Sequence, residues 1–217
     1  MHNTVTVDRK TQQFGGGHRL YFQGDDAAVR AVGAYTDDVY GGVRFERHVA
    51  LHNGTIVVVD RLFSDAERVY DLAHHSFGAL ATDLPLEPVE KLDAAPMYEL
   101  AANPRRGSVP AGGRAAVHWQ QDDAVMWYQV VNVEDRPLEM DLATGWANVR
   151  YQLVRQEAPF VMARQHGKSA VFVSVMSFGA APVAVGRVER AGDRLAVELP
   201  DGRLEFDFAA NKVNMVK

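Results

Sequence analysis

VRFERHVALHNGTIVVVDRL, residues 43–62, is the stretch that decides the fold class of this chain. Apolar residues recur at every second position on either side of Asn53-Gly54, which is the period of a β-strand. Asn-Gly favours a two-residue type I′ turn, because both turn positions need a positive φ. The stretch therefore predicts an antiparallel hairpin over Val43–Leu62 with its turn at Asn53-Gly54.

The turn also sets the register of this hairpin. In that register the apolar residues face one another in three pairs: Leu51 with Ile56, Val49 with Val58, and Phe45 with Leu62. Arg47 and Asp60 then lie opposite each other on the apolar side of the ribbon, and Glu46 meets Arg61 on the other side. Since either charge alone would be costly to bury, Arg47 and Asp60 are predicted to be a structural pair.

The same two-residue period recurs along the chain, for example at Val5–Val7, Val125–Trp127 and Val171–Val175. Roughly fourteen to sixteen strands can be drawn between turn signals. This number suits an all-β fold, a large antiparallel two-sheet β-sandwich that forms a single domain over residues 1–217. A short helix is conceivable only at Leu84–Ala102, where prolines favour an irregular excursion with edge segments instead.

A second hairpin is predicted near the C-terminus, over Arg194–Phe208 with its turn at Asp201-Gly202. The hydrophobic pattern selects a register with three apolar pairs: Leu199 with Leu204, Val197 with Phe206, and Leu195 with Phe208. The tail Asn211–Lys217 could add one more strand.

Composition excludes several classes of function. The net charge is −5, with 23 Lys and Arg against 28 Asp and Glu, and no basic cluster suggests nucleic acid as a partner. The chain has no cysteine, which excludes disulfides, thiolate zinc sites and cysteine nucleophiles. No apolar run approaches the ~20 residues of a membrane span. The first residues alternate polar and apolar side chains, which is not the pattern of a signal peptide.

Histidines are the first candidates for chemistry. His74 and His75 are adjacent at the end of a predicted strand, Val69–Leu72. Adjacent strand residues point to opposite faces, so the two cannot bind one metal ion together, and at most one faces a given cleft. His48 and His52 are interpreted as surface or groove residues. No HxH or HExxH spacing occurs, so a self-contained zinc site is not expected.

Aromatic side chains could supply platforms for stacking of sugar rings. The candidates are Tyr35, Tyr40, Trp119, Trp127, Tyr128, Trp146 and Tyr151. In β-sandwiches, however, most Trp and Tyr side chains pack in the core or at its rim. From the residues alone, the chain is therefore a large β-sandwich for which a binding role stays open.

Several stretches taken together resemble one family. His2–Asp8, followed by Gln12-Gln13, resembles the H-N-T-V-x-V-D-G-x-x-Q segment of heparinase II/III-like polysaccharide lyases, with Arg9 where that family often has Gly. Later stretches are similar to the strands of this family in order and spacing: Tyr40–Val49 with Ile56–Leu62, Val69–His75, and Ala158–Arg164 with Ala170–Val175. The resemblance runs from His2 to about Phe178.

The resemblance implies an N-terminal α/α toroid, which is absent from this chain, and a C-terminal β-sandwich, to which the chain corresponds. These lyases cleave uronate-containing polysaccharides, such as alginate or heparin-like chains, by β-elimination. A base takes the proton next to the uronate carboxylate and an acid assists the leaving oxygen. Tyr and His residues near the toroid usually move these protons, so this part of a carbon–oxygen lyase is expected to have little or no activity alone.

The resemblance also implies cofactors, partners and a location. Many members hold zinc in the sandwich, and His2 matches one ligand, whereas the other ligands come from earlier strands. The isolated chain is therefore expected to hold no zinc. The implied partners are an acidic polysaccharide and either a toroid-domain chain or a second copy in a homo-oligomer, because a sheet face normally covered would be exposed. The implied location is periplasmic or secreted.

Two other interpretations stay open. The chain could be a non-catalytic carbohydrate-binding or subunit-interaction module, which binding without cleavage would favour. It could also be a complete small enzyme that uses His75 or His74 together with Tyr40 as catalytic residues. Replacing His75 by Ala in an active preparation would test that third interpretation.

Overall fold

The computed structural model describes residues 3–24, 28–96, 98, 100–148 and 155–216, which form strands and no helix. The strands are β1 (Val5–Val7), β2 (His18–Gln23), β3 (Arg30–Thr36), β4 (Val43–His52), β5 (Thr55–His75), β6 (Ala79–Thr82), β7 (Glu87–Pro88), β8 (Ala102–Val109), β9 (Arg114–Gln121), β10 (Ala124–Val131), β11 (Leu138–Asn148), β12 (Arg155–Phe178), β13 (Val188–Ala191), β14 (Arg194–Leu199), β15 (Gly202–Asp207) and β16 (Lys212–Val216). The predicted all-β class is confirmed. Within the described residues there is no helix that could cross a membrane.

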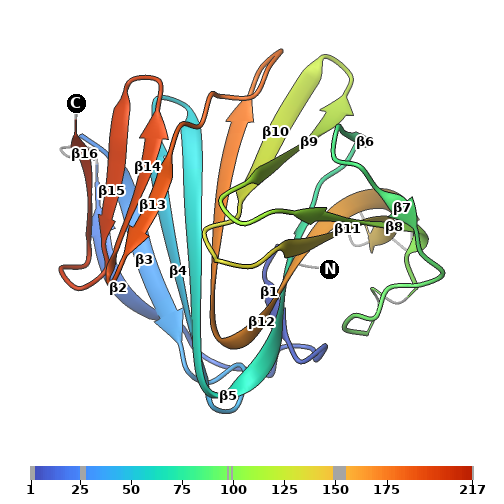
Figure 1. Cartoon of the computed structure of the whole chain (residues 1–217), viewed down its shortest axis with the longest axis horizontal. Helices are drawn as coiled ribbons and strands as arrows, with labels where there is room; N and C mark the ends of the chain where they lie inside the picture. The colour runs from blue at the N-terminus through green and yellow to red at the C-terminus, as the bar shows by residue number, and fades with distance from the viewer. Residues whose placement is uncertain (1–2, 25–27, 97, 99, 149–154, 217) are drawn as a thin grey trace.

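The strands form two antiparallel sheets (Figure 1). The larger sheet has 12 strands, and its main path is β2-β3-β4-β5-β12-β10-β9-β6, with β1, β11, β8 and β7 attached to the side. The smaller sheet has 4 strands in the order β13-β14-β15-β16. This arrangement agrees with the predicted antiparallel two-sheet sandwich.

Two very long strands connect the halves of the larger sheet (Figure 1). β5 has 21 residues and β12 has 24, and they pair with each other along most of their length. The first part of β5 pairs with β4 and its last part with β1, while β12 pairs first with β11 and then with β10. A register shift between Gly167 and Ser169 marks the bend, as expected of a β-bulge. The larger sheet therefore supplies two layers, an upper layer (β2-β3-β4-β5-β12-β10-β9-β6) and a lower layer (β1-β5-β12-β11-β8-β7).

Each face of the upper layer has its own core. On the inner face, Phe45 and Phe172 pack in one cluster with Leu72 and Met140 of the lower layer. On the outer face, the alternate residues of the same strands pack against the four-stranded sheet in a second cluster: Ala31, Ala50, Val57, Val59, Val173, Leu195, Val197, Leu204 and Phe206. The upper layer is thus apolar on both faces, which is typical of a sheet covered on both sides.

The first predicted hairpin is confirmed in detail. Asn53 and Gly54 have φ values of 45° and 74°, as a type I′ turn requires. All of the predicted cross-strand pairs between β4 and β5 are present. The separate strand predicted at Val69–Leu72 is instead the end of β5. The middle of β5, Asp65–Glu67, is exposed where the strand passes from one layer to the other. The polar sequence of this segment therefore resembles that of a turn.

The second hairpin forms, but its predicted register is wrong by two residues. The turn is Pro200-Asp201, and Leu199 pairs with Gly202, Val197 with Leu204 and Leu195 with Phe206. Proline restricts its own φ to the value that the first position of a turn requires, which explains why the turn forms at Pro200-Asp201. A shift of two residues keeps each side chain on its predicted face, so the core forms from the expected residues. The predicted last strand is β16.

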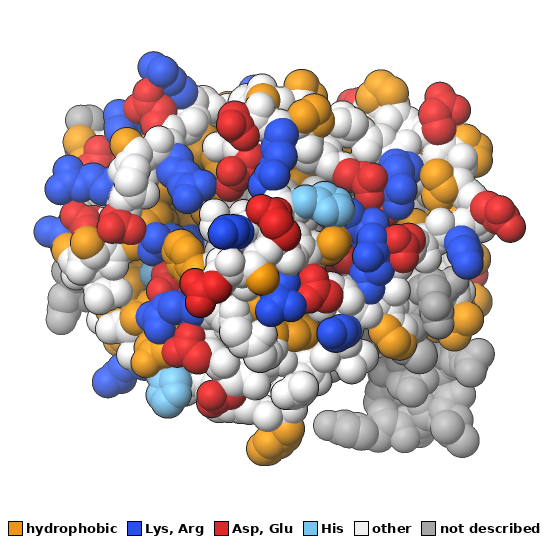
Figure 2. Space-filling model, turned by 60° about the horizontal axis from the view of Figure 1, so that its bottom comes forward, with side chains coloured by type: hydrophobic (Ala, Val, Ile, Leu, Met, Phe, Trp, Pro, Cys, Tyr) orange, Lys and Arg blue, Asp and Glu red, His pale blue; other side chains and the backbone are white. Residues whose placement is uncertain are grey.

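The charges do not gather by sign on the face drawn in Figure 2, where acidic and basic side chains are interspersed. Some oppositely charged side chains of the chain form exposed pairs, such as Arg187 with Glu189 at 2.9 Å. The face drawn in Figure 2 therefore carries no continuous stripe of basic side chains.

Candidate functional site

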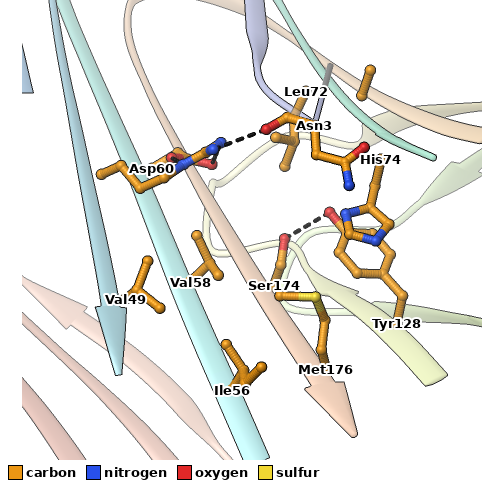
Figure 3. Close-up of a pocket in the computed structure, with 12 residues that line it drawn as sticks. Asn3, Val49, Ile56, Val58, Asp60, Leu72, His74, Tyr128, Ser174 and Met176 are labelled. Carbon is orange, nitrogen blue, oxygen red and sulfur yellow. Dashed lines mark hydrogen bonds and ion pairs between the residues drawn. The ribbon is translucent and has the colours of Figure 1, made fainter. Parts of the chain in front are cut away.

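A cavity of about 310 Å³ opens where the upper and lower layers separate, beside Asn3 (Figure 3). Its walls come from β4, β5, β10 and β12 and from the residue that precedes β1 by two positions. The lining residues are Asn3, Arg47, Val49, Ile56, Val58, Asp60, Leu72, Ala73, His74, Tyr128, Ser174 and Met176. Half of these side chains are apolar, and the polar ones are grouped in two places.

The first polar group is His74 with Tyr128 and Ser174 (Figure 3). The Tyr128 and Ser174 hydroxyl oxygens are 2.8 Å apart, which is a hydrogen bond between β10 and β12. The His74 ring stacks on the Tyr128 ring, with centroids 4.3 Å apart and an interplanar angle of 14°. The side chains meet because β5 carries His74 into the lower layer while β10 and β12 carry the other two in the upper layer.

Burial determines the protonation states of His74 and Tyr128. It lowers the pKa of His74 to about 4, and the positive charge of Arg47 acts in the same direction. It also raises the pKa of Tyr128 well above its usual range. At neutral pH the cavity therefore holds an uncharged imidazole, which can accept a proton, and a protonated phenol, which can donate one.

The second polar group is Arg47 with Asp60. Arg47 Nε donates to Asp60 Oδ1 at 2.6 Å and Nη2 donates to Oδ2 at 2.9 Å, which is the bidentate geometry that makes such pairs strong. The Arg47 Nη1 also donates to the Asn3 carbonyl oxygen at 2.9 Å. Burial lowers the pKa of Arg47, but the Asp60 carboxylate raises it overall. The guanidinium therefore stays charged, and its N–H groups already donate hydrogen bonds to Asp60 and to Asn3.

His75 lies on the opposite face of β5, as the alternation of strand side chains predicts. Its ring packs against Tyr98 and Phe160, with centroids 5.6 Å and 5.1 Å away. Its main-chain N–H donates to Asn3 Oδ1 at 2.7 Å, and Asn3 Nδ2 donates to the His75 carbonyl at 3.3 Å. His75 thus holds Asn3 at the rim of the cavity without lining it.

Tyr40 lies away from the cavity lining. Its hydroxyl donates to the carbonyls of Val5 and Lys10, both at 3.3 Å. Burial raises the pKa of Tyr40 to about 12. The structure does not bring Tyr40 into the cavity with His74, and the contacts of Tyr40 hold β1 against the segment that follows it.

His2 lies outside the described residues. Among the residues that the structure does describe, no group of three or more His, Asp or Glu side chains is arranged to hold a metal ion. The described residues therefore do not fit a zinc site by themselves.

The interpretation of His48 as a surface or groove residue is wrong. Its side chain is 1% exposed, its Nδ1 is 3.1 Å from the Tyr21 hydroxyl, and its ring packs on Phe208. The four-stranded sheet covers this face of β4. The sequence of residues 43–62 contains no signal that this face is buried. His52 lies at the edge of the same face, 2.9 Å from an Asp201 carboxylate oxygen.

The sequence did not indicate that Asn3 and Ser174 line a cavity, and it offered Tyr128 only as one of several aromatic candidates. Of those aromatics, Trp119 and Tyr40 are buried, Trp146 is 42% exposed, and Tyr151 lies outside the described residues. The Tyr128–Ser174 bond joins residues 46 positions apart, so no local motif could have revealed it.

Comparison with known proteins places this fold. No family model and no curated protein matches the chain. A solved structure of heparinase III superimposes with a TM-score of 0.70 at 15% identity, covering 99% of this chain. This chain has a heparinase III-like fold. A mutant of the heparan sulfate lyase HepC from Pedobacter heparinus gives a TM-score of 0.66 at 12% identity over 95% of the chain, and a further heparinase III gives 0.67 at 12% over 99%.

The predicted resemblance is confirmed at the level of the fold. The likeness fits a heparinase-like C-terminal β-domain, and about 30% of each longer protein is covered. The chain therefore spans less than a third of the length of the lyases whose structures it matches.

Proposed function

We propose that this heparinase III-like chain is the β-domain of a polysaccharide lyase that cleaves uronate-containing polysaccharide, heparin-like or alginate, by β-elimination. The observation that carries the proposal is the match of 99% of this chain to heparinase III. The chain supplies one part of the enzyme and is inactive alone. Its partners are the acidic polysaccharide and the polypeptide that carries the rest of the active site.

The cavity supports the idea of an incomplete site. β-Elimination needs a base, an acid, and a positive or hydrogen-bonding group that neutralises the uronate carboxylate. His74 and Tyr128 could act as base and acid, but Arg47 is already engaged by Asp60 and Asn3. The cavity of about 310 Å³ is also at the lower end of small-molecule pockets, whereas a polymer needs an open cleft.

We expect no lyase activity from the purified chain. Each cleavage by β-elimination leaves a carbon–carbon double bond conjugated to a carboxylate, and this product absorbs ultraviolet light. Because we expect no cleavage, the ultraviolet absorbance of alginate, heparin and heparan sulfate incubated with the chain should not rise. A complete heparan sulfate lyase is the positive control. Sustained product release by the chain would contradict this expectation, and in that case the His74→Gln, His75→Ala and Tyr40→Phe variants would show which of these residues acts.

A non-catalytic carbohydrate-binding module is the second candidate, and Trp146 is the observation that favours it. Trp146 is 42% exposed on β11, whereas Trp119 is fully buried. An exposed indole offers a flat apolar face of the kind that packs against sugar rings.

If this second function holds, Trp146→Ala should weaken binding to alginate or heparin by about two- to twelvefold, since aromatic packing contributes about 0.5–1.5 kcal/mol. Affinity electrophoresis in gels that contain the polymer measures the change. Phe178→Ala is the matched control, because Phe178 is an aromatic residue that is 66% exposed in β12. Equal effects of the two substitutions would contradict a specific role for Trp146.

A further inference from the structure

Two hairpin turns meet at one end of the contact between the upper layer and the four-stranded sheet (Figure 1). One turn is Asn53-Gly54, which joins β4 to β5, and the other is Pro200-Asp201, which joins β14 to β15. The His52 side chain lies between the two turns and is 15% exposed, while that of Asp201 is 40% exposed. Because His52 and Asp201 are 149 positions apart, their contact depends on how the two sheets pack.

Both nitrogens of the His52 ring face oxygen atoms. Nδ1 lies 3.2 Å from the main-chain carbonyl oxygen of Ala28, and Nε2 lies 2.9 Å from Asp201 Oδ2. A carbonyl and an ionised carboxyl group can only accept hydrogen bonds. A neutral imidazole has one N–H and one lone pair, whereas an imidazolium has two N–H groups. Only the imidazolium can therefore donate a hydrogen bond at both contacts.

Asp201 does not supply the missing proton. Hydrogen bonds from the Asn53 amide and from His52 lower the pKa of the Asp201 carboxyl from its usual value. The carboxyl group is therefore ionised throughout the neutral pH range and acts as an acceptor towards His52. The second proton must be on the ring.

The Asn53 side chain leads to the same result. Its Nδ2 donates to Asp201 Oδ2 and lies 3.1 Å from His52 Nε2. If Nε2 accepted that amide hydrogen, its lone pair would also face the Asp201 carboxylate at 2.9 Å, where two electron-rich atoms repel. The other neutral tautomer would place the lone pair of Nδ1 against the Ala28 carbonyl oxygen. Each neutral form thus makes one of the two contacts repulsive.

We propose that His52 is a pH-sensitive latch that holds the Pro200-Asp201 turn of the four-stranded sheet against the upper layer. The protonated ring closes the latch, because it donates to Ala28 and Asp201 together and its charge is opposite to that of the carboxylate. Loss of the proton opens the latch, because one of the two contacts is then lost. Histidines change charge between about pH 5 and pH 8, so the latch is tight at the acid end of this range and weak at the alkaline end.

The other attachments of the four-stranded sheet lie away from this latch. At the opposite end of β14, Arg61 Nη2 donates to Asp193 Oδ1 at 3.0 Å, and both of these groups keep their charges at neutral pH. His48 is the second histidine at this interface. Its ring nitrogens face the Tyr21 hydroxyl at 3.1 Å and the Glu46 carboxylate at 3.6 Å. Among the printed contacts of His52, which come from the segment before β3, from Asn53 and from the β14–β15 turn, Asp201 is the one charged partner within the described residues.

Hydrogen exchange of the purified chain, followed by mass spectrometry at pH 6 and pH 8, tests the latch. Exchange in the peptide that contains Leu199–Leu204 reports opening of the β14–β15 turn once the intrinsic effect of pH on exchange is removed. We expect opening to be about three- to tenfold more frequent at pH 8, as the loss of one hydrogen bond implies. A peptide that contains Arg190–Arg194 at the opposite turn is the internal reference and should show no such change.

Asp201→Asn distinguishes the latch from other effects of pH. The new carboxamide can accept from the protonated ring through its oxygen, and it can donate to the lone pair of the neutral ring through its nitrogen. The turn of this variant should therefore stay closed at both pH values. His52→Gln should also lose the pH dependence, but with the turn more open than in the parent protein at pH 6. His166→Gln, which removes an exposed histidine, should keep the pH dependence of the parent.

The outcomes decide between the latch and its alternatives. Equal opening of the parent turn at pH 6 and pH 8 would overturn the proposal. A full pH dependence in either Asp201→Asn or His52→Gln would do the same, because the titrating group would then lie elsewhere. An equal rise in exchange at Arg190–Arg194 would assign the effect to the interface as a whole and not to His52.

Discussion

Replacing Arg47 by Met is expected to lower the free energy of unfolding by about 3–5 kcal/mol, since removal of one partner leaves a buried charge uncompensated. Asp60 is only 1% exposed and both of its oxygens accept hydrogen bonds from Arg47. In the variant Asp60 must either keep its charge without a partner or take up a proton at a cost. Urea unfolding at pH 7, followed by circular dichroism, measures the loss.

The double variant Arg47→Met with Asp60→Leu should recover most of this loss, because replacing both partners by apolar groups is often close to neutral. Arg187→Met is the matched control. Its ion pair with Glu189 is solvent-exposed, with the Arg187 side chain 75% exposed, and such pairs contribute about 0–1 kcal/mol. A loss below about 1 kcal/mol for Arg47→Met would contradict the structural role of the pair.

Acidification from pH 7 to pH 4 is expected to destabilise the protein through His74. The folded state lowers the pKa of His74 from 6.5 to about 4, mainly by burial. The unfolded chain therefore binds a proton near pH 6.5 that the folded chain does not bind until about pH 4. Stability falls as the pH falls through this window, by about 3 kcal/mol from this one group.

His74→Gln removes the titrating group and should remove about that much of the difference between unfolding free energies at pH 7 and pH 4. His166→Gln is the matched control, since it removes an imidazole that is exposed. Urea titrations of the three proteins at both pH values give the comparison. A His74→Gln variant that keeps the full pH dependence of the parent would refute the assignment.

The parts of the fold that were predictable are those that depend on neighbours in sequence. Asn53-Gly54 specified a turn, the turn specified a register, and the register placed Arg47 opposite Asp60. The second hairpin shows the limit of such rules. Pro200 competes with Asp201-Gly202 for the turn, and because both registers bury the same face, hydrophobic alternation could not choose between them.

The site was less predictable than the fold. The opposite directions of His74 and His75 follow from strand alternation alone. That His74 meets Tyr128 and Ser174, and that Tyr40 does not join them, depends on how the larger sheet bends over itself. The burial of His48 likewise depends on the four-stranded sheet, whose residues lie far along the chain.

The sequence by itself determined that the chain is a β-structure, where its first hairpin turns, and which charges face each other across it. These properties arise from φ preferences and side-chain alternation over a few residues. Only the tertiary structure decided that β5 and β12 run through both layers, that a cavity opens beside Asn3, and that His74 and Tyr128 meet there. Such features result from packing between distant strands, and packing free energy depends on surfaces that come together only when the whole sheet has folded.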